Sequence, residues 1–118
     1  MGKSILVVDD ERDVRGFLTE LLEDQGYSVR EAENGIQAMA LIEEAKPDLI
    51  LLDLLMPKET GTDFFRKIHH KKECGDIPVI VISGLPGRHL AVSKSVPVFD
   101  KPIDEIRLLE AIGKAIQQ

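Results

Sequence analysis

The sequence predicts an α/β fold, a doubly wound parallel sheet of five strands with helices on both faces. Short apolar runs alternate along the chain with segments in which apolar residues recur every three or four positions. Strands that alternate with helices form right-handed βαβ units around a parallel sheet. With 118 residues, 43% of them hydrophobic and 31% charged, we expect residues 1–118 to form a single globular domain.

Each expected element has its own pattern. Strands appear as runs of four or five apolar, often β-branched residues, and helices as apolar residues that share one face. Gly26 closes the first helix, whose apolar face includes Phe17, and Lys46-Pro47 ends the second. The last helix carries Ile106, Leu109, Ile112 and Ile116 on one face. In chain order we expect strand 4–8, helix 14–22, strand 28–32, helix 36–45, strand 48–52, a helix after Gly61, strand 78–82, strand 96–99 and helix 103–116.

The strands can be ranked by how apolar their faces are. The runs that begin at Ser4, Asp48 and Pro78 are apolar on both faces, so we expect them inside the sheet. The strand from Ser28 has one polar face, and the strand from Val96 contains a proline that cannot donate a sheet hydrogen bond. These two belong at the edges. The order 2-1-3-4-5, a flavodoxin-like winding, satisfies this ranking and opens a ligand crevice between the first and third strands.

Carboxylates follow the first and third strands. Asp9 and Asp10 come directly after the first strand, and Asp53 ends the Leu- and Ile-rich third. Two unit charges about 4 Å apart repel by roughly 4 kcal/mol at an effective dielectric near 20, and a hard divalent cation removes that penalty. A site that provides few carboxylates and leaves the other coordination positions to water suits Mg²⁺ (or Mn²⁺). Alternatively, Asp53 caps a turn before Pro57.

Two more polar residues follow the remaining strands. The fourth strand ends in the hydroxyl of Ser83, and the fifth leads to the cation Lys101. All parallel strands finish at the same edge, so these side chains are expected beside Asp53. A carboxylate nucleophile, a metal, a hydroxyl and a lysine together provide what phosphoryl transfer requires. The sequence therefore predicts phosphoryl transfer at this edge.

These motifs resemble the response-regulator receiver domain (CheY-like) of two-component signal transduction. The resemblance implies that a sensor histidine kinase or phosphotransfer protein phosphorylates Asp53 in a Mg²⁺-dependent reaction, which switches a surface that binds a downstream protein. It also implies that the domain catalyses only its own phosphorylation and dephosphorylation. The similarity covers essentially the whole chain and rests on Val7-Val8-Asp9-Asp10-Glu11, Leu51-Leu52-Asp53-Leu54-Leu55-Met56-Pro57, Gly61, Ser83 and Lys101-Pro102.

The resemblance assigns a role to each matching residue. Arg12, Asp13 and Arg15 receive none and are interpreted as a solvated helix face. The implied roles are phospho-acceptor for Asp53, metal ligand for Asp10 and Asp53, metal contact through water for Asp9, metal ligand through its main-chain carbonyl for Leu55, and contact with the phosphoryl oxygens for Lys101 and Ser83.

The chain departs from the family between the fourth and fifth strands. The position that is usually aromatic holds Val98, whereas Phe99 lies one place later and, by alternation, would face the other side. The segment is short, contains prolines and lacks a helical period, so we expect the fourth helix to be short or missing. Ser83, Gly84 and Phe99 are the candidate switch residues. We hypothesise that the signal is read through another face or through ordering of 84–96.

Two other functions are compatible with parts of this sequence. One is a receiver fold kept as a phosphorylation-independent docking or dimerisation module. The unusual segment before Val96 favours it, whereas the intact set of Asp10, Asp53, Ser83 and Lys101 argues against it. The other is a phosphatase with an aspartyl nucleophile, which needs an acid two residues after that nucleophile. That position holds Leu55, whose side chain cannot protonate a leaving group, so the sequence argues against a phosphatase.

Charge and composition exclude further classes. The chain has 15 Lys and Arg against 21 Asp and Glu, a net charge of −6, which argues against direct binding of nucleic acid. No apolar run reaches the roughly 20 residues of a membrane span, and the N-terminal residues do not resemble a signal peptide. The lone Cys74 cannot form an internal disulfide. We therefore expect a cytoplasmic protein without a membrane partner.

Overall fold

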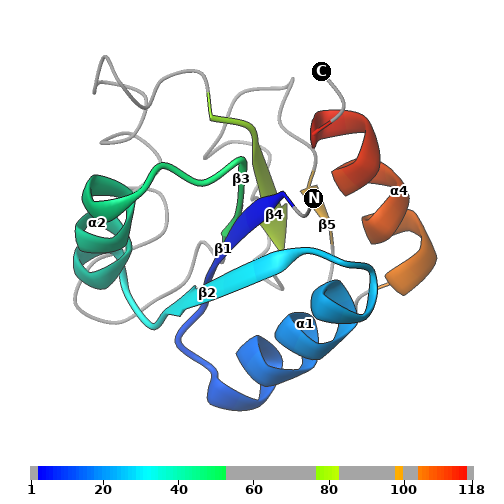
Figure 1. The fold of residues 1–118 in the computed structure, drawn as a ribbon. Coiled ribbons are helices and arrows are strands. Elements are labelled where there is room, and N and C mark those ends of the chain that lie inside the picture. Colours follow the sequence, from blue (N-terminus) through cyan, green and yellow to red (C-terminus); the bar gives the residue numbers. More distant parts are fainter. Residues whose placement is uncertain (1–2, 53–76, 83–97, 100–103, 117–118) are drawn as a thin grey trace.

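The computed structural model describes residues 3–52, 77–82, 98–99 and 104–116. Figure 1 shows the strands at the centre, with helices around them. The helix expected after Gly61 and the short or missing fourth helix lie outside the described residues; α4 of Figure 1 is the last helix of the chain. The described elements are β1 (Ser4–Val8), α1 (Arg12–Asp24), β2 (Ser28–Ala32), α2 (Gly35–Glu44), β3 (Leu49–Leu52), β4 (Val79–Ile82), β5 (Val98–Phe99) and α4 (Glu105–Ile116).

The described strands run parallel in one sheet, in the order β2-β1-β3-β4-β5. This order agrees with the ranking of the strands by their apolar faces, and the predicted parallel α/β fold is confirmed. In the register, Val8 pairs with Ala32 of β2 and with Leu52 of β3, and Leu52 pairs with Val81 of β4. The carboxyl ends of these strands therefore lie nearly level at one edge of the sheet.

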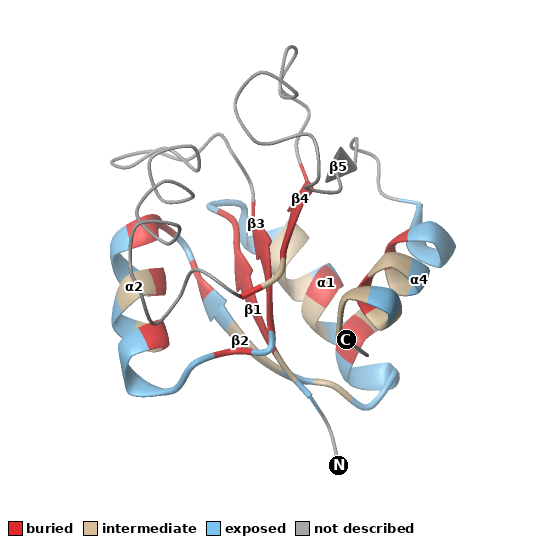
Figure 2. Ribbon diagram, turned by 90° about the horizontal axis from the view of Figure 1, so that it is seen from above, coloured by how far each residue is buried: buried red, intermediate tan, exposed pale blue. Residues whose placement is uncertain are grey.

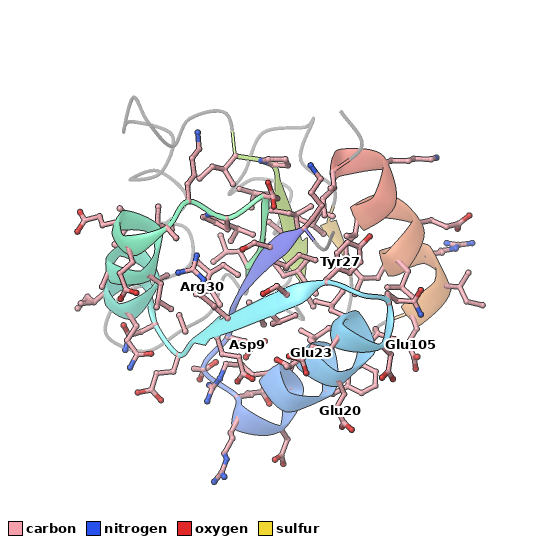
Figure 3. All side chains as sticks on the ribbon, in the orientation of Figure 1. Asp9, Glu20, Glu23, Tyr27, Arg30 and Glu105 are labelled. Carbon is pink, nitrogen blue, oxygen red and sulfur yellow. The ribbon has the colours of Figure 1, made fainter. Side chains whose placement is uncertain are left out.

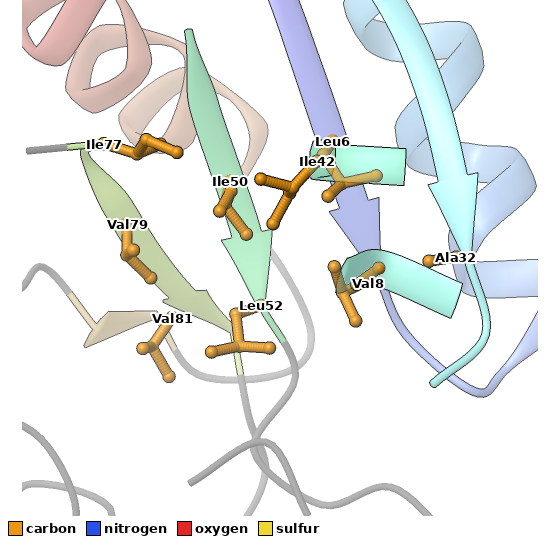
Figure 4. Close-up of a cluster of buried hydrophobic side chains, with 10 residues drawn as sticks. Leu6, Val8, Ala32, Ile42, Ile50, Leu52, Ile77, Val79 and Val81 are labelled. Carbon is orange, nitrogen blue, oxygen red and sulfur yellow. The ribbon is translucent and has the colours of Figure 1, made fainter. Parts of the chain in front are cut away.

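Helices cover both faces of the sheet, with α2 on one side and α1 and α4 on the other (Figure 2). Successive strand residues point to opposite faces, so each interior strand supplies both layers of the core. Full burial of one large aliphatic side chain contributes about 1.5–3 kcal/mol, which makes these layers the main source of stability. The layer under α2 (Figure 4) comprises Leu6, Val8, Ala32, Ala38, Ile42, Ile50, Leu52, Ile77, Val79 and Val81, and the opposite layer comprises Ile5, Val7, Leu18, Leu22, Leu49, Leu51, Ile80, Ile82, Leu108 and Ile112.

The buried faces of α1 and α4 differ in part from the prediction. Ile106 was predicted to share the apolar face of the last helix with Ile112, but it is 74% exposed, and the fully buried residues of α4 are Leu108 and Ile112. A helix turns about 100° per residue, so Ile106 lies about 200° from Leu108 around the axis and faces away from the sheet. Phe17 of α1 is likewise 43% exposed, although the apolar face of that helix includes it.

Gly26 ends α1 as expected, and the structure shows how. Its φ of 91° lies in the left-handed region. The amide of Gly26 donates to the carbonyl of Glu23 (3.0 Å), and the amide of Tyr27 donates to the carbonyl of Leu22 (3.1 Å). This pair of bonds is the Schellman motif, which satisfies carbonyls that the helix leaves without partners and turns the chain into β2.

We expect Gly26→Ala to lower the free energy of unfolding by about 1–2 kcal/mol, because an L-residue pays roughly that to adopt the left-handed conformation. Gly16→Ala, inside α1, is the matched control. A Cβ at Gly16 meets nothing within 4 Å, so the higher helix propensity of Ala should raise the free energy of unfolding by about 0.5–1 kcal/mol. Urea unfolding followed by circular dichroism measures both. A stabilising Gly26→Ala would contradict the assignment of this turn.

Side chains also close both ends of α2. The Asn34 side chain accepts a hydrogen bond from the Gln37 amide (2.9 Å), which caps the first turn. At the other end, the guanidinium of Arg30 on β2 donates to the carbonyls of Leu41 (2.8 Å) and Ala45. Arg30 therefore ties the polar side of the edge strand β2 to the helix beside it (Figure 3).

Candidate functional site

The candidate site lies where the interior strands end. Asp9 and Asp10 follow β1 directly, and β1 pairs with β3 up to Val8 and Leu52. The backbone of Asp9 and Asp10 thus lies at the carboxyl end of β1, the edge of the sheet at which this winding is expected to open its crevice. The other predicted site residues, Asp53, Leu55, Ser83, Gly84 and Lys101, lie outside the described residues; Phe99 is described only as part of the β5 backbone.

Asp9 is buried, with 2% of its surface exposed. Its amide donates to the carbonyl of Ala32 in β2 (3.1 Å), and its Oδ1 accepts a hydrogen bond from the amide of Glu11 (2.9 Å). The second bond is the local turn that an Asp side chain forms with the amide two residues ahead. Asp9 therefore joins the end of β1 both to β2 and to the start of α1 (Figure 3).

Asp10 differs from its neighbour because it is exposed. It lies between two residues whose backbones are held, Asp9 by β2 and Glu11 by the Asp9 side chain. The carboxylate of Asp10 is thus presented to solvent from an anchored stretch of backbone. The resemblance implies different roles for the two aspartates, and the structure also distinguishes them, as a buried and an accessible residue.

The donor set of this edge fits a hard divalent cation. Carboxylate oxygens are the ligands that Mg²⁺ prefers, and it usually takes one or two of them and keeps several waters. Within the described ranges, no group of three or more His, Cys, Asp or Glu side chains is placed to hold a metal. Among the described residues, Asp9 and Asp10 therefore supply two carboxylates of the predicted site but do not complete it. The third predicted carboxylate, Asp53, is not among the described residues.

Arg15 was interpreted as part of a solvated helix face, and this interpretation was wrong. Its side chain is only 13% exposed, and Nη1 donates to the main-chain carbonyl of Asp9 (2.7 Å). Its Nε is 3.2 Å from Oε1 of Glu31 on β2, and the other carboxylate oxygen of Glu31 accepts a hydrogen bond from Thr19 (2.7 Å). The sequence offered one signal for this contact: Arg15 is a charged residue within the first two turns of the helix that follows Asp9-Asp10.

Comparison with known proteins settles the family. The sequence model of the response regulator receiver domain matches residues 5–113. The chain belongs to the response regulator receiver family. This receiver domain is 31% identical to protein Rrf1 of Nitratidesulfovibrio vulgaris over 116 residues, which cover 98% of the chain and 84% of Rrf1. It is 43% identical over 83 residues to the phosphate regulon transcriptional regulatory protein PhoB of Pseudomonas aeruginosa, covering 70% of the chain but 36% of PhoB.

Solved structures support the same assignment. The receiver domain aligns with a putative response regulator from Chloroflexus aurantiacus with a TM-score of 0.92 over 100% of both chains, at 22% identity, a likeness that concerns the fold alone. It also aligns with the chemotaxis protein CheY4 of Vibrio cholerae with a TM-score of 0.88 and 25% identity, over 98% of this chain and 99% of that one. The predicted resemblance is confirmed.

Family membership fixes the coarse function of the domain. It is a receiver domain of two-component response regulators, consistent with phospho-acceptor signalling. Receiver domains generally bind Mg²⁺, and they are not enzymes in the usual sense. None of the helices described here combines the length and the apolar character needed to cross a membrane.

Proposed function

We propose that this receiver domain accepts a phosphoryl group on Asp53 from a sensor histidine kinase or phosphotransfer protein, in a Mg²⁺-dependent reaction, and thereby switches a surface that binds a downstream protein. The observation that carries the proposal is the register between β1 and β3. Val8, the residue before Asp9, pairs with Leu52, the residue before Asp53. Neighbouring strands lie about 4.8 Å apart, so the proposal assigns Asp53 a position beside the acidic pair.

The proposed chemistry is a displacement at phosphorus. A carboxylate oxygen of Asp53 forms a bond to phosphorus while the bond from phosphorus to the donor's imidazole nitrogen breaks, and the imidazole takes up a proton. Water later hydrolyses the acyl phosphate and regenerates Asp53. The domain is the acceptor in the first reaction and its own acyl phosphate is hydrolysed in the second, so each cycle consumes one phosphorylated donor and one water and releases phosphate.

The other residues of the set neutralise and orient the transferring group. Bound Mg²⁺ would offset the charge that the phosphoryl oxygens carry during transfer. We assign its direct protein ligands to Asp10, Asp53 and the main-chain carbonyl of Leu55, with Asp9 acting through water. Lys101 would pair with a phosphoryl oxygen. The exposure of Asp10 and the burial of Asp9 support the division between direct and water-mediated contact.

A second phosphoryl contact connects the chemistry to the output. We assign it to the hydroxyl of Ser83, with Gly84 and Phe99 as the remaining switch residues. The excess of acidic residues in the chain, 21 against 15 basic ones, favours a protein target over nucleic acid for this domain. Response regulators are typically cytoplasmic, and the proposal places the reaction there.

Acetyl phosphate tests the proposal without a kinase. With Mg²⁺, the domain should gain the mass of one phosphoryl group, and brief treatment with base should remove it. Asp53→Asn should gain none, because an amide cannot form the acyl phosphate. Asp48→Asn should retain the gain, because Asp48 lies at the opposite end of the same strand, where its Oδ2 accepts a hydrogen bond from the Ser4 amide (2.7 Å). A mass gain that survives in Asp53→Asn, or in excess chelator, would contradict the proposal.

A further inference from the structure

Arg15, Thr19 and Glu31 form a connected set of polar contacts around the backbone of Asp9, which we call the Arg15 clamp. Arg15 Nη1 donates to the carbonyl oxygen of Asp9 at 2.7 Å. Arg15 Nε donates to Oε1 of Glu31 at 3.2 Å, and the Thr19 hydroxyl donates to Oε2 of Glu31 at 2.7 Å. Glu31 is on β2 and Thr19 lies one turn after Arg15 on α1, so Thr19 holds the carboxylate that in turn holds the guanidinium.

The carbonyl held by Arg15 belongs to the peptide that joins Asp9 to Asp10. A peptide unit is planar, so a bond that fixes this oxygen also fixes the nitrogen and the Cα of Asp10. The amide of Asp9 is already bonded to Ala32, and its side chain is bonded to the amide of Glu11. The contact from Arg15 thus acts on the peptide that leads directly to the accessible carboxylate.

We propose that Arg15 is a positioning residue for the acidic pair: it orients the peptide between Asp9 and Asp10 and so strengthens the binding of a divalent cation by their carboxylates. This inference rests on the proposed function. Arg15 touches neither the cation nor the transferring group and acts through the backbone of Asp9. Glu31 has two effects, because it orients the guanidinium and offsets its charge next to a cation site.

An electrostatic role and a positioning role of Arg15 predict opposite changes in Mg²⁺ affinity when Arg15 is lost. A positive charge close to the acidic pair repels a second cation, so its removal would tighten Mg²⁺ binding if charge were the main effect. If orientation of the Asp9–Asp10 peptide is the main effect, removal weakens Mg²⁺ binding. Partners that orient metal ligands typically change metal affinity about 10–100-fold when they are lost.

The experiment is a Mg²⁺ titration of the complete chain, followed through the backbone amide signals of Asp10 and Glu11 in the folded protein. Arg15→Met should weaken Mg²⁺ binding roughly tenfold. The matched control Arg12→Met removes the same charge from an exposed side chain three residues earlier and should change the affinity by less than about twofold, because exposed charges are screened. Arg15→Lys should be intermediate, because a single ammonium lacks the fork that reaches two acceptors.

Glu31→Gln gives a second route to the same question. It removes the ion pair with Arg15 and retains an acceptor for Thr19, so a smaller loss of Mg²⁺ affinity is expected. The amide signals that report binding come only from folded protein. A variant that is less stable but otherwise unchanged therefore shows the wild-type Mg²⁺ affinity. If Arg15→Met does not fold, Arg15→Lys and Glu31→Gln decide the question.

The outcomes separate the two proposals. If the wild-type domain binds Mg²⁺ and the Arg15 and Glu31 variants bind it equally well or more tightly, the positioning role is overturned. The proposed function is then unaffected. A wild-type domain that binds no Mg²⁺ would overturn the proposed function and the positioning role together. Equal losses in Arg12→Met and Arg15→Met would show that the loss does not depend on the contact between Arg15 and Asp9, and would overturn the positioning role.

Discussion

Asp10→Ala is expected to weaken Mg²⁺ binding by more than about 100-fold and to stop phosphorylation by acetyl phosphate at ordinary Mg²⁺ concentrations. Loss of a residue that only orients a metal ligand costs about 10–100-fold in affinity, so loss of a direct ligand should exceed that range. Asp10 is the exposed member of the acidic pair, held between the fixed backbones of Asp9 and Glu11. Mg²⁺ titration and intact mass after treatment with acetyl phosphate measure the two effects.

Asp13→Ala provides the matched control for Asp10→Ala. It removes the same charge in the first turn of α1, three residues further along the chain. Long-range attraction of the cation is therefore changed to a similar degree in both variants, whereas a direct contact is lost in only one. Near-wild-type Mg²⁺ affinity in Asp10→Ala, or an equal loss in Asp13→Ala, would contradict the assignment of Asp10 as a ligand.

Ile80→Ala is expected to have the largest effect on stability, a loss of about 2–5 kcal/mol in the free energy of unfolding. Ile80 is fully buried in β4, in the core layer between the sheet and the helices α1 and α4. Truncation removes its transfer free energy and leaves a cavity that the rigid sheet cannot fill. Since small domains are stable by only about 5–15 kcal/mol, the midpoint of urea unfolding should fall markedly.

Ile106→Ala is the same substitution at an exposed position. Ile106 is 74% exposed on α4, so its truncation should change the free energy of unfolding by no more than about 0.5 kcal/mol. Similar slopes of free energy against urea in both variants would show that the denatured state is unchanged. Comparable losses in Ile80→Ala and Ile106→Ala would contradict the described position of α4 on the sheet.

The fold was predictable because a strand that is buried on both faces has a continuous apolar run, whereas a strand that is buried on one face alternates between apolar and polar residues. In β1 and β3, successive residues from Ile5 to Val8 and from Leu49 to Leu52 all lie in the core, and only a sheet covered by helices on both sides buries such a run. β2 is not an uninterrupted buried run, because Ser28 and Glu31 are exposed, and it lies at the edge. Apolar runs therefore determine which strands are interior, and the interior strands determine the order.

The facing of the helices was less predictable. Periodicity identified the apolar residues of α4 but not which of them meet the sheet, and Ile106 belongs to the same apolar set as the buried Ile112. The rotation of a helix about its axis is set by the residues it packs against, which a local pattern does not contain. Leu108, which the face assigned from periodicity did not include, is fully buried.

The candidate site was predictable only as a set of strand ends. That Asp9 and Asp10 follow an interior strand is evident from the sequence, but the burial of one and the exposure of the other depend on bonds to Ala32 and Glu11. The role of Arg15 depends on Glu31, sixteen residues away, and no local pattern encodes such a pairing. The roles of Asp53, Ser83 and Lys101 stay predictions.

The most direct measurement is the chemical location of the phosphoryl group. After treatment with acetyl phosphate and Mg²⁺, borohydride reduces an aspartyl phosphate to the alcohol homoserine, and mass spectrometry of peptides then identifies the modified residue. We predict homoserine at position 53 alone, and none when Mg²⁺ is chelated. Homoserine at position 9 or 10, or a phosphoryl group found on a histidine with residue 53 unmodified, would contradict Asp53 as the acceptor.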